Sequence, residues 1–137
     1  MHVNNAFLHG DLEEVFMKIP PSFSSSSPNK VCHLKKPIYG LHHAPRQWFA
    51  KLSYNLCEYG FAKSYADYSL FVYCKGDIFM ALLAYVDDIV LANNNAQASK
   101  EFKDYLHTCF SIKDLGTLKY FLSIEVARGP EGMFLCQ

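Results

Sequence analysis

The chain has 137 residues, its 13 basic and 13 acidic side chains give a formal net charge of zero, and half of its residues are hydrophobic. This composition is typical of one globular domain and excludes the polar, charge-rich composition of disordered chains. No apolar run reaches the roughly 18 residues that cross a bilayer, and the first residues lack the features of a secretory signal, so we expect no membrane contact.

The first half of the chain predicts a strand, a loop and a helix. The strand-like run includes Phe7 and Leu8. Residues 22–29 read SFSSSSPN, directly after two prolines, and this composition predicts a flexible loop. A helix is predicted from Pro45, since proline is favoured in a first turn, to the position before Gly60, since glycine is favoured just after a last turn. The apolar face of this helix consists of Trp48, Phe49, Leu52 and Leu56.

The middle of the chain predicts a hairpin, a further strand and a second helix. Residues 69–73 and 78–85 are β-rich runs, and the Cys74-Lys75-Gly76-Asp77 segment between them predicts the turn of a hairpin. Residues 89–92 predict a short strand. The spacing of apolar side chains in residues 98–109 predicts an amphipathic helix.

The last part of the chain predicts another hairpin. Apolar side chains alternate along residues 118–127, which predicts one strand with one apolar face, and residues 129–132 turn the chain toward a strand at 133–136. Together these elements predict an α+β fold, in which helices pack on one face of an antiparallel sheet. Because both ends fall within strand-like runs, we expect residues 1–137 to be a partial domain that is truncated at both ends.

The cysteines indicate neither a zinc ribbon nor a disulfide framework. There are five, an odd number at wide intervals and without a CxxC pair. We interpret them as small core side chains of a protein in a reducing, intracellular compartment. They are Cys32, Cys57, Cys74, Cys109 and Cys136.

Basic residues gather in one part of this neutral chain. Residues 15–57 contain no Asp or Glu. Such a stretch can follow a phosphate backbone, and it can equally be a set of solvated surface lysines. Its basic side chains are Lys18, Lys30, Lys35, Lys36, Arg46 and Lys51.

Asp87 and Asp88 are adjacent carboxylates between two apolar strands. Two carboxylates at the tip of a hairpin repel each other and lose solvation, and a divalent cation between them offsets this cost. Carboxylate oxygens are the ligands that Mg²⁺ prefers. The pattern therefore predicts either a magnesium site or an ordinary solvated Asp-Asp turn.

The Tyr85-Val86-Asp87-Asp88 motif is one of several that follow each other along the chain. The others are residues 3–12 (VNNAFLHGDL), 38–48 (IYGLHHAPRQW), 66–71 (ADYSLF), 112–116 (IKDLG) and 119–126 (KYFLSIEV). In this order, and over essentially the whole chain, these motifs resemble the copia-type retrotransposon reverse transcriptase. The Tyr85-Val86-Asp87-Asp88 motif resembles the palm motif of that family.

The resemblance implies a chemistry and its partners. In the family, three Asp carboxylates hold two Mg²⁺ ions, or Mn²⁺, which activate the primer 3′-hydroxyl and stabilise the leaving pyrophosphate. Asp87 and Asp88 correspond to two of these catalytic, metal-binding carboxylates. The expected partners are an RNA or DNA template–primer and a deoxynucleoside triphosphate. The expected fold is an incomplete palm and fingers, without the rest of the Pol polyprotein.

The resemblance also implies substrate contacts. Phe7 falls where the family has an aromatic steric gate against the ribose 2′-hydroxyl, and ordinary core packing is the other interpretation of this residue. Trp48 and Phe49 are interpreted as helix-to-sheet packing. The nucleotide-binding positions are Val3, Asn5, Ala6, Phe7, Tyr39 and Gly40. The primer-contacting positions are Tyr85, Tyr120, Phe121 and Leu122. The expected contacts to the nucleic-acid backbone are Lys35, Lys36 and Arg46.

The chain departs from the family pattern at the position of the third carboxylate. His2 stands there, directly before Val3, and imidazole is a poor ligand for the hard Mg²⁺ ion. Asn93 and Ser123 stand at positions that are usually glycine in the family. We therefore predict that the chain no longer polymerises. The alternative function is a nucleic-acid-binding module without catalysis that uses the basic residues 30–51.

Overall fold

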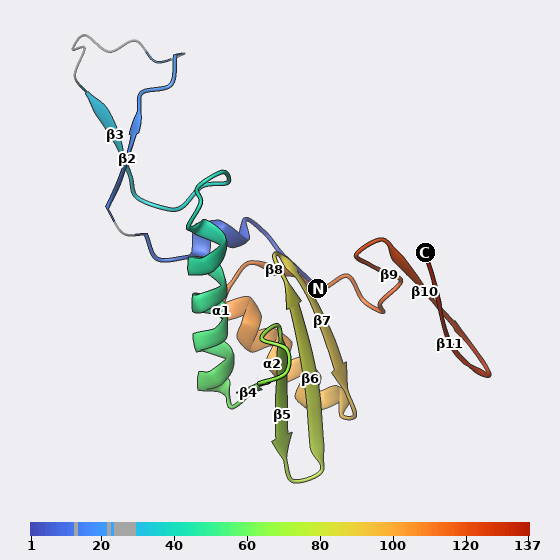
Figure 1. Ribbon diagram of the computed structural model, residues 1–137. Coiled ribbons are helices and arrows are strands. Elements are labelled where there is room, and N and C mark those ends of the chain that lie inside the picture. The colour runs from blue at the N-terminus through green and yellow to red at the C-terminus, as the bar shows by residue number, and fades with distance from the viewer. Residues whose placement is uncertain (13, 22, 24–29) are drawn as a thin grey trace.

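The structure is a computed structural model that describes residues 1–12, 14–21, 23 and 30–137 (Figure 1). Except for Phe23, the loop predicted at residues 22–29 lies outside the described residues. In chain order the elements are β1 (His2–Val3), a 3-10 helix η1 (Ala6–His9), β2 (Val15–Lys18), β3 (Val31–Leu34), α1 (Ala44–Tyr59), β4 (Ala62–Lys63), β5 (Leu70–Lys75), β6 (Ile78–Tyr85), β7 (Asp88–Asn93), α2 (Ala96–Cys109), β8 (Ile112–Lys113), β9 (Tyr120–Phe121), β10 (Ile124–Gly129) and β11 (Gly132–Cys136). Within the described part of the chain, no helix is long and apolar enough to cross a membrane.

Antiparallel pairing organises the described strands into three sheets. The main sheet has six strands in the order β4-β5-β6-β7-β1-β8. The strands β9, β10 and β11 form a second sheet, and β2 pairs with β3. Figure 1 shows both smaller sheets projecting away from the main sheet, which together with α1 and α2 forms the body of the molecule.

The helices begin and end at residues that favour helix termini. Pro45 lies in the first turn of α1, and Gly60 follows the last turn in a left-handed conformation with φ of 115°, as the sequence predicts. The second helix begins at Ala96 rather than at the predicted Ala98. The reason is that the Asn95 side chain accepts a hydrogen bond from the Ala98 N–H at 2.9 Å and so caps an earlier start.

Both helices pack on one face of the main sheet. Along β6 the alternate residues Met80, Leu82 and Ala84 are buried, as expected for a strand with one covered face. The core contains residues of both helices and of the main sheet, among them Trp48, Leu52 and Leu56 from α1, Phe102 and Leu106 from α2, and Phe71, Met80, Leu82 and Ile89 from the sheet. This arrangement confirms the predicted α+β class.

The strand predicted at Phe7 and Leu8 is wrong. Both residues lie in the 3-10 helix η1. Asn5, directly before this helix, has a left-handed φ of 50°, a conformation that asparagine adopts more readily than most residues. The turn at Asn5 therefore ends β1 after Val3.

The single strand predicted at residues 118–127 is also wrong. Two strands are present there, and β9 and β10 pair directly through Phe121 and Ile124. The two residues between them, Leu122 and Ser123, have φ of 50° and 68°. Two left-handed residues in a two-residue loop are typical of a type I′ hairpin, which favours Asn-Gly. Apolar alternation continues across so tight a turn, so the periodicity of the sequence does not reveal it.

Replacing Ser123 with glycine is expected to stabilise the chain by about 0.5–1 kcal/mol. A left-handed non-glycine residue carries strain on the order of 1 kcal/mol or more, and the greater unfolded-state entropy of glycine offsets part of the gain. The measurement is urea denaturation followed by circular dichroism. Asn93→Gly is the matched control, because Asn93 ends β7 without a positive φ and glycine should destabilise a strand there by about 0.5–1 kcal/mol. Equal effects of the two substitutions would contradict the role of the turn.

Candidate functional site

The candidate site lies where β1 pairs with β7. His2 is directly opposite Asp88 in this pairing. The Val3 N–H donates to the Asp87 carbonyl at 2.8 Å, and the Ile89 N–H donates to the Met1 carbonyl at 2.9 Å. Backbone hydrogen bonds thus hold the position before Val3 beside the two carboxylates, as the family resemblance implies. The strand order places residues that are far apart in the sequence side by side at this point.

His2, Asp87 and Asp88 form a cluster of potential metal ligands. Their ligand atoms lie within 4.8 Å of one another, and all three residues are half-buried. His2 Nδ1 lies 3.1 Å from Asp88 Oδ1, with side-chain exposures of 38% for His2 and 45% for Asp88. The cluster offers two carboxylates and one imidazole. This donor set does not fit the pair of Mg²⁺ ions that three carboxylates hold, because Mg²⁺ requires oxygen ligands and a neutral ring supplies no compensating charge.

The turn that carries Asp87 has a strained backbone, and a hydrogen bond from a core residue stabilises it. Tyr85 pairs with Asp88, which leaves Val86 and Asp87 as a two-residue turn. Val86 has a φ of 53°, which is unusual for a β-branched side chain. The indole Nε1–H of Trp48 donates to the Val86 carbonyl at 2.6 Å. The core of the domain is therefore connected directly to the tip of this turn.

Trp48 is the residue whose role the sequence interpretation missed. Its packing role was predicted, and the structure confirms it, since the side chain is 1% exposed. The hydrogen bond to the turn was not predicted. A signal was available, because a buried tryptophan usually finds a partner for its N–H.

The residues expected to bind the nucleotide are divided between the core and the surface. Val3, Ala6 and Phe7 are buried in the core, with Phe7 8% exposed. The ring centroids of Phe7 and Tyr39 lie 4.5 Å apart. The packing interpretation of Phe7 therefore agrees with the structure. The exposed members of the set are Asn5, Tyr39 and Gly40.

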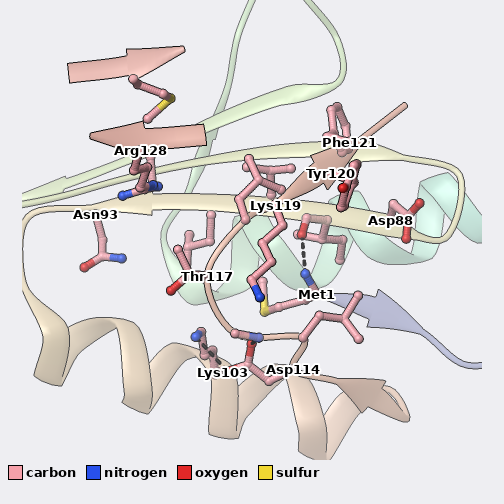
Figure 2. A pocket seen from close by; sticks show the side chains of 18 residues that line it. Met1, Asp88, Asn93, Lys103, Asp114, Thr117, Lys119, Tyr120, Phe121 and Arg128 are labelled. Carbon is pink, nitrogen blue, oxygen red and sulfur yellow. Dashed lines mark hydrogen bonds and ion pairs between the residues drawn. The ribbon is translucent and has the colours of Figure 1, made fainter. Parts of the chain in front are cut away.

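A cavity of about 770 Å³ lies beside the metal-ligand cluster. It is bounded by β7, by the segment before β9 and by the three-stranded sheet of β9, β10 and β11. Asp88, Tyr120 and Phe121 all line it, and Figure 2 shows them toward the same end. Two predicted primer contacts therefore share a cavity with one of the carboxylates. The other two, Tyr85 and Leu122, are exposed and do not line this cavity.

Charged side chains at the cavity are partly engaged with each other. Lys103 Nζ lies 2.7 Å from Asp114 Oδ2 (Figure 2). The hydrogen bond from Lys103 holds the pKa of Asp114 below its usual value, although partial burial of the carboxyl group opposes this shift. The remaining basic side chains of the cavity are Lys119 and Arg128.

One of the basic side chains in residues 15–57 is already paired with a carboxylate, which the sequence pattern does not indicate. Lys51 on α1 forms an ion pair with Asp11 at 3.1 Å. Asp11 lies just outside the acid-free stretch, so the sequence pattern does not indicate this partner. The predicted backbone contacts are all exposed, namely Lys35, Lys36 and Arg46.

Comparisons with known proteins agree on one family. The whole chain, residues 1–137, matches the family model described as reverse transcriptase (RNA-dependent DNA polymerase). The chain is 45% identical to the retrovirus-related Pol polyprotein from transposon RE2 of Arabidopsis thaliana, over 100% of the chain and 10% of that protein. It is 35% identical to the corresponding polyprotein from transposon TNT 1-94 of Nicotiana tabacum, over 93% of the chain and 10% of that protein. It thus spans about a tenth of the length of these relatives. No solved structure matches the chain.

Proposed function

Since the chain belongs to the reverse transcriptase (RNA-dependent DNA polymerase) family and is similar to copia-type Pol polyproteins, we propose that it is the palm part of a retrotransposon polymerase that no longer transfers nucleotides. In this proposal residues 1–137 are one partial reverse transcriptase domain. The family uses nucleic-acid substrates and is generally dependent on divalent metal ions. The substrates in the intact family are a template–primer and a deoxynucleoside triphosphate.

One observation supports the loss of activity, namely the pairing of His2 with Asp88. The position that the family fills with its third Asp lies within the ligand cluster and is held there by backbone hydrogen bonds. An imidazole at this position removes a full negative charge from the place where two metal cations would gather. In this proposal the substitution removes a metal ligand, while the backbone pairing of β1 with β7 is kept.

What the remaining residues do follows from their positions. The β1–β7 pairing holds Asp88 beside the cavity, and the Trp48 hydrogen bond holds the Val86-Asp87 turn. In this proposal Tyr120 and Phe121, which line the same cavity, contact the end of a primer. The arrangement retains the groups that orient a substrate and lacks one that holds metal.

A second candidate function is nucleic-acid binding without catalysis. The observation that favours it is that Lys35, Lys36 and Arg46 are exposed and, among the described residues, take part in no ion pair. Cations of this kind can bind phosphates without any base contact. In such a module the ligand cluster would have no role.

The test of the proposed function is single-nucleotide extension of a primer on poly(rA), with Mg²⁺ and with Mn²⁺. We expect no extension by the chain under conditions in which an active reverse transcriptase extends every primer. Extension by the unmodified chain would overturn the proposal, since the third carboxylate would then be dispensable.

The two candidate functions differ in their affinity for template–primer. A binding module should lose affinity steeply with salt, with a slope that becomes shallower when Lys35 and Lys36 are both replaced by alanine. The matched control is the pair Lys75→Ala and Lys100→Ala, which removes two exposed cations from other elements. An inert remnant should show no salt-dependent binding in any of the three proteins.

A further inference from the structure

The cluster of His2, Asp87 and Asp88 has a donor set of its own, and we infer that it binds a borderline transition-metal dication of the Zn²⁺ type in preference to Mg²⁺. This inference goes beyond the proposed function, because loss of polymerisation does not require that any metal bind. It concerns which ion the altered site selects. It rests on the three ligand positions of this chain.

The spacing of the ligand atoms suits a single ion. Ligands about 2.0–2.1 Å from a tetrahedral Zn²⁺ ion lie roughly 3.3 Å from each other. His2 Nδ1 and Asp88 Oδ1 already lie 3.1 Å apart. Both residues can therefore bind one ion with small changes in their side-chain torsions.

The third ligand comes from the turn. Asp87 offers a carboxylate oxygen within 4.8 Å of the other two ligand atoms. A rotation of this half-buried side chain is enough to bring it to the ion. The backbone on both sides does not have to move, because the hydrogen bonds of Val3 and Ile89 already fix β1 against β7.

The site also leaves room for water on the ion. The His2 and Asp88 side chains are 38% and 45% exposed, so solvent reaches the cluster from one side. Three protein ligands and one water complete a four-coordinate ion. A dication between two carboxylates also removes the repulsion between Asp87 and Asp88.

The choice of ion follows from the donor atoms. Mg²⁺ demands near-octahedral oxygen coordination and dehydrates reluctantly, so it gains little from an imidazole. Zn²⁺ and Co²⁺ bind imidazole and carboxylate together readily, and they rank above Mn²⁺ and Fe²⁺ in general affinity. Replacing Asp by His at this position therefore changes the selectivity of the site.

A hydrogen bond between His2 and Asp88 explains their 3.1 Å contact without a metal, and a calorimetric titration of the 137-residue chain separates the two possibilities. We expect one Zn²⁺ ion per chain, bound at least tenfold more tightly than by the His2→Asn variant. The matched control is His42→Ala, which removes an exposed histidine outside the cluster and should leave the affinity unchanged. In His2→Asp the ratio of Zn²⁺ to Mg²⁺ affinity should fall at least tenfold.

The free cysteines make a check of ligand identity necessary. The interpretation of the cysteines as core side chains is wrong for Cys57, Cys74 and Cys136, which are exposed. Thiolates also bind Zn²⁺. Co²⁺ serves as the spectroscopic probe, because thiolate ligation gives intense charge-transfer bands in the near ultraviolet and nitrogen–oxygen ligation gives only weak visible bands. We expect weak visible bands that disappear in His2→Asn. The presence or absence of thiolate bands needs only the unmodified chain, so this part of the test remains decisive if His2→Asn does not fold.

Equal Zn²⁺ affinities of the unmodified chain and His2→Asn, or thiolate bands in the Co²⁺ complex, would overturn the inference. Neither result affects the proposed function, which primer extension tests separately. Conversely, extension by the unmodified chain would overturn the proposed function and leave the zinc titration unaffected.

Discussion

Replacing Trp48 with phenylalanine is expected to destabilise the chain by about 2–4 kcal/mol. The smaller ring leaves a void in a fully packed core, where such truncations cost on the order of 1–3 kcal/mol. The lost hydrogen bond to the Val86 carbonyl adds about 1 kcal/mol. Urea denaturation followed by circular dichroism measures the change. Trp48→Ala should cost more, about 3–5 kcal/mol, which is a large part of the stability of a domain of this size.

The position of Trp48 predicts an effect on the site as well as on stability. The matched control is Leu52→Ala, one turn later on the same buried face, because Leu52 is fully buried and makes no contact with the turn that is comparable to the indole hydrogen bond. Both variants should lose stability. Only Trp48→Phe should also weaken Zn²⁺ binding, measured where both proteins are still folded, because Asp87 is then less well held. Equal Zn²⁺ affinities in the two variants would show that Trp48 acts through packing alone.

Changing His2 to Asp is expected to leave primer extension undetectable, although it completes three carboxylates at the site. Extension also needs a primer end and a template held in register. Such positioning contributes about 7–11 kcal/mol to reactions of this kind. The chain spans about 10% of the relatives it matches, and we expect it to supply only part of this positioning on its own. Losing half of it costs about three orders of magnitude in rate, at about 1.4 kcal/mol per tenfold.

The measurement for His2→Asp is extension on a poly(rA) template with Mg²⁺, at the highest soluble protein concentration. Detectable extension would contradict the prediction and would show that His2 alone silences an otherwise sufficient site. The combined variant with Asp88→Asn is the control, since it removes a carboxylate of the cluster and should abolish any activity that comes from it. Activity that survives in the combined variant would indicate a contaminating polymerase.

The parts of the fold that depend on long periodic patterns could be predicted from the sequence. The helix from Pro45 to Gly60 and the pair of strands around Gly76 follow from apolar spacing and from residues that favour ends and turns. The family resemblance and the hairpin around Tyr85 predicted that Asp87 and Asp88 lie close to the strand that contains Val3. The structure agrees, and it adds the register, in which His2 pairs with Asp88. Long-range pairing of this kind is not encoded in the local spacing of side chains.

The parts that could not be predicted depend on single backbone conformations. Asn5, Val86, Leu122 and Ser123 are the non-glycine residues with positive φ among those described. Apart from asparagine, none belongs to a residue type that favours this conformation, so residue type did not reveal it. The one indication came from the family, which usually has glycine at the position of Ser123. The ion pair of Lys51 with Asp11 was missed for a related reason, because it joins a helix to a loop that is 40 positions away.

The hydrogen bond from Trp48 to the turn has a consequence for optical spectroscopy. Trp48 is the single tryptophan of the chain, so its indole is the source of the emission that is excited at the red edge of protein absorption. That indole lies 2.6 Å from the carbonyl of the residue before Asp87, and its emission therefore depends on the geometry of the turn. Binding of a metal ion at Asp87, or loss of the hydrogen bond between Trp48 and the turn, should shift the emission wavelength and the lifetime of this fluorescence. The molecule thus carries a label-free optical reporter beside its candidate site, and no dye or second tryptophan has to be introduced to observe it.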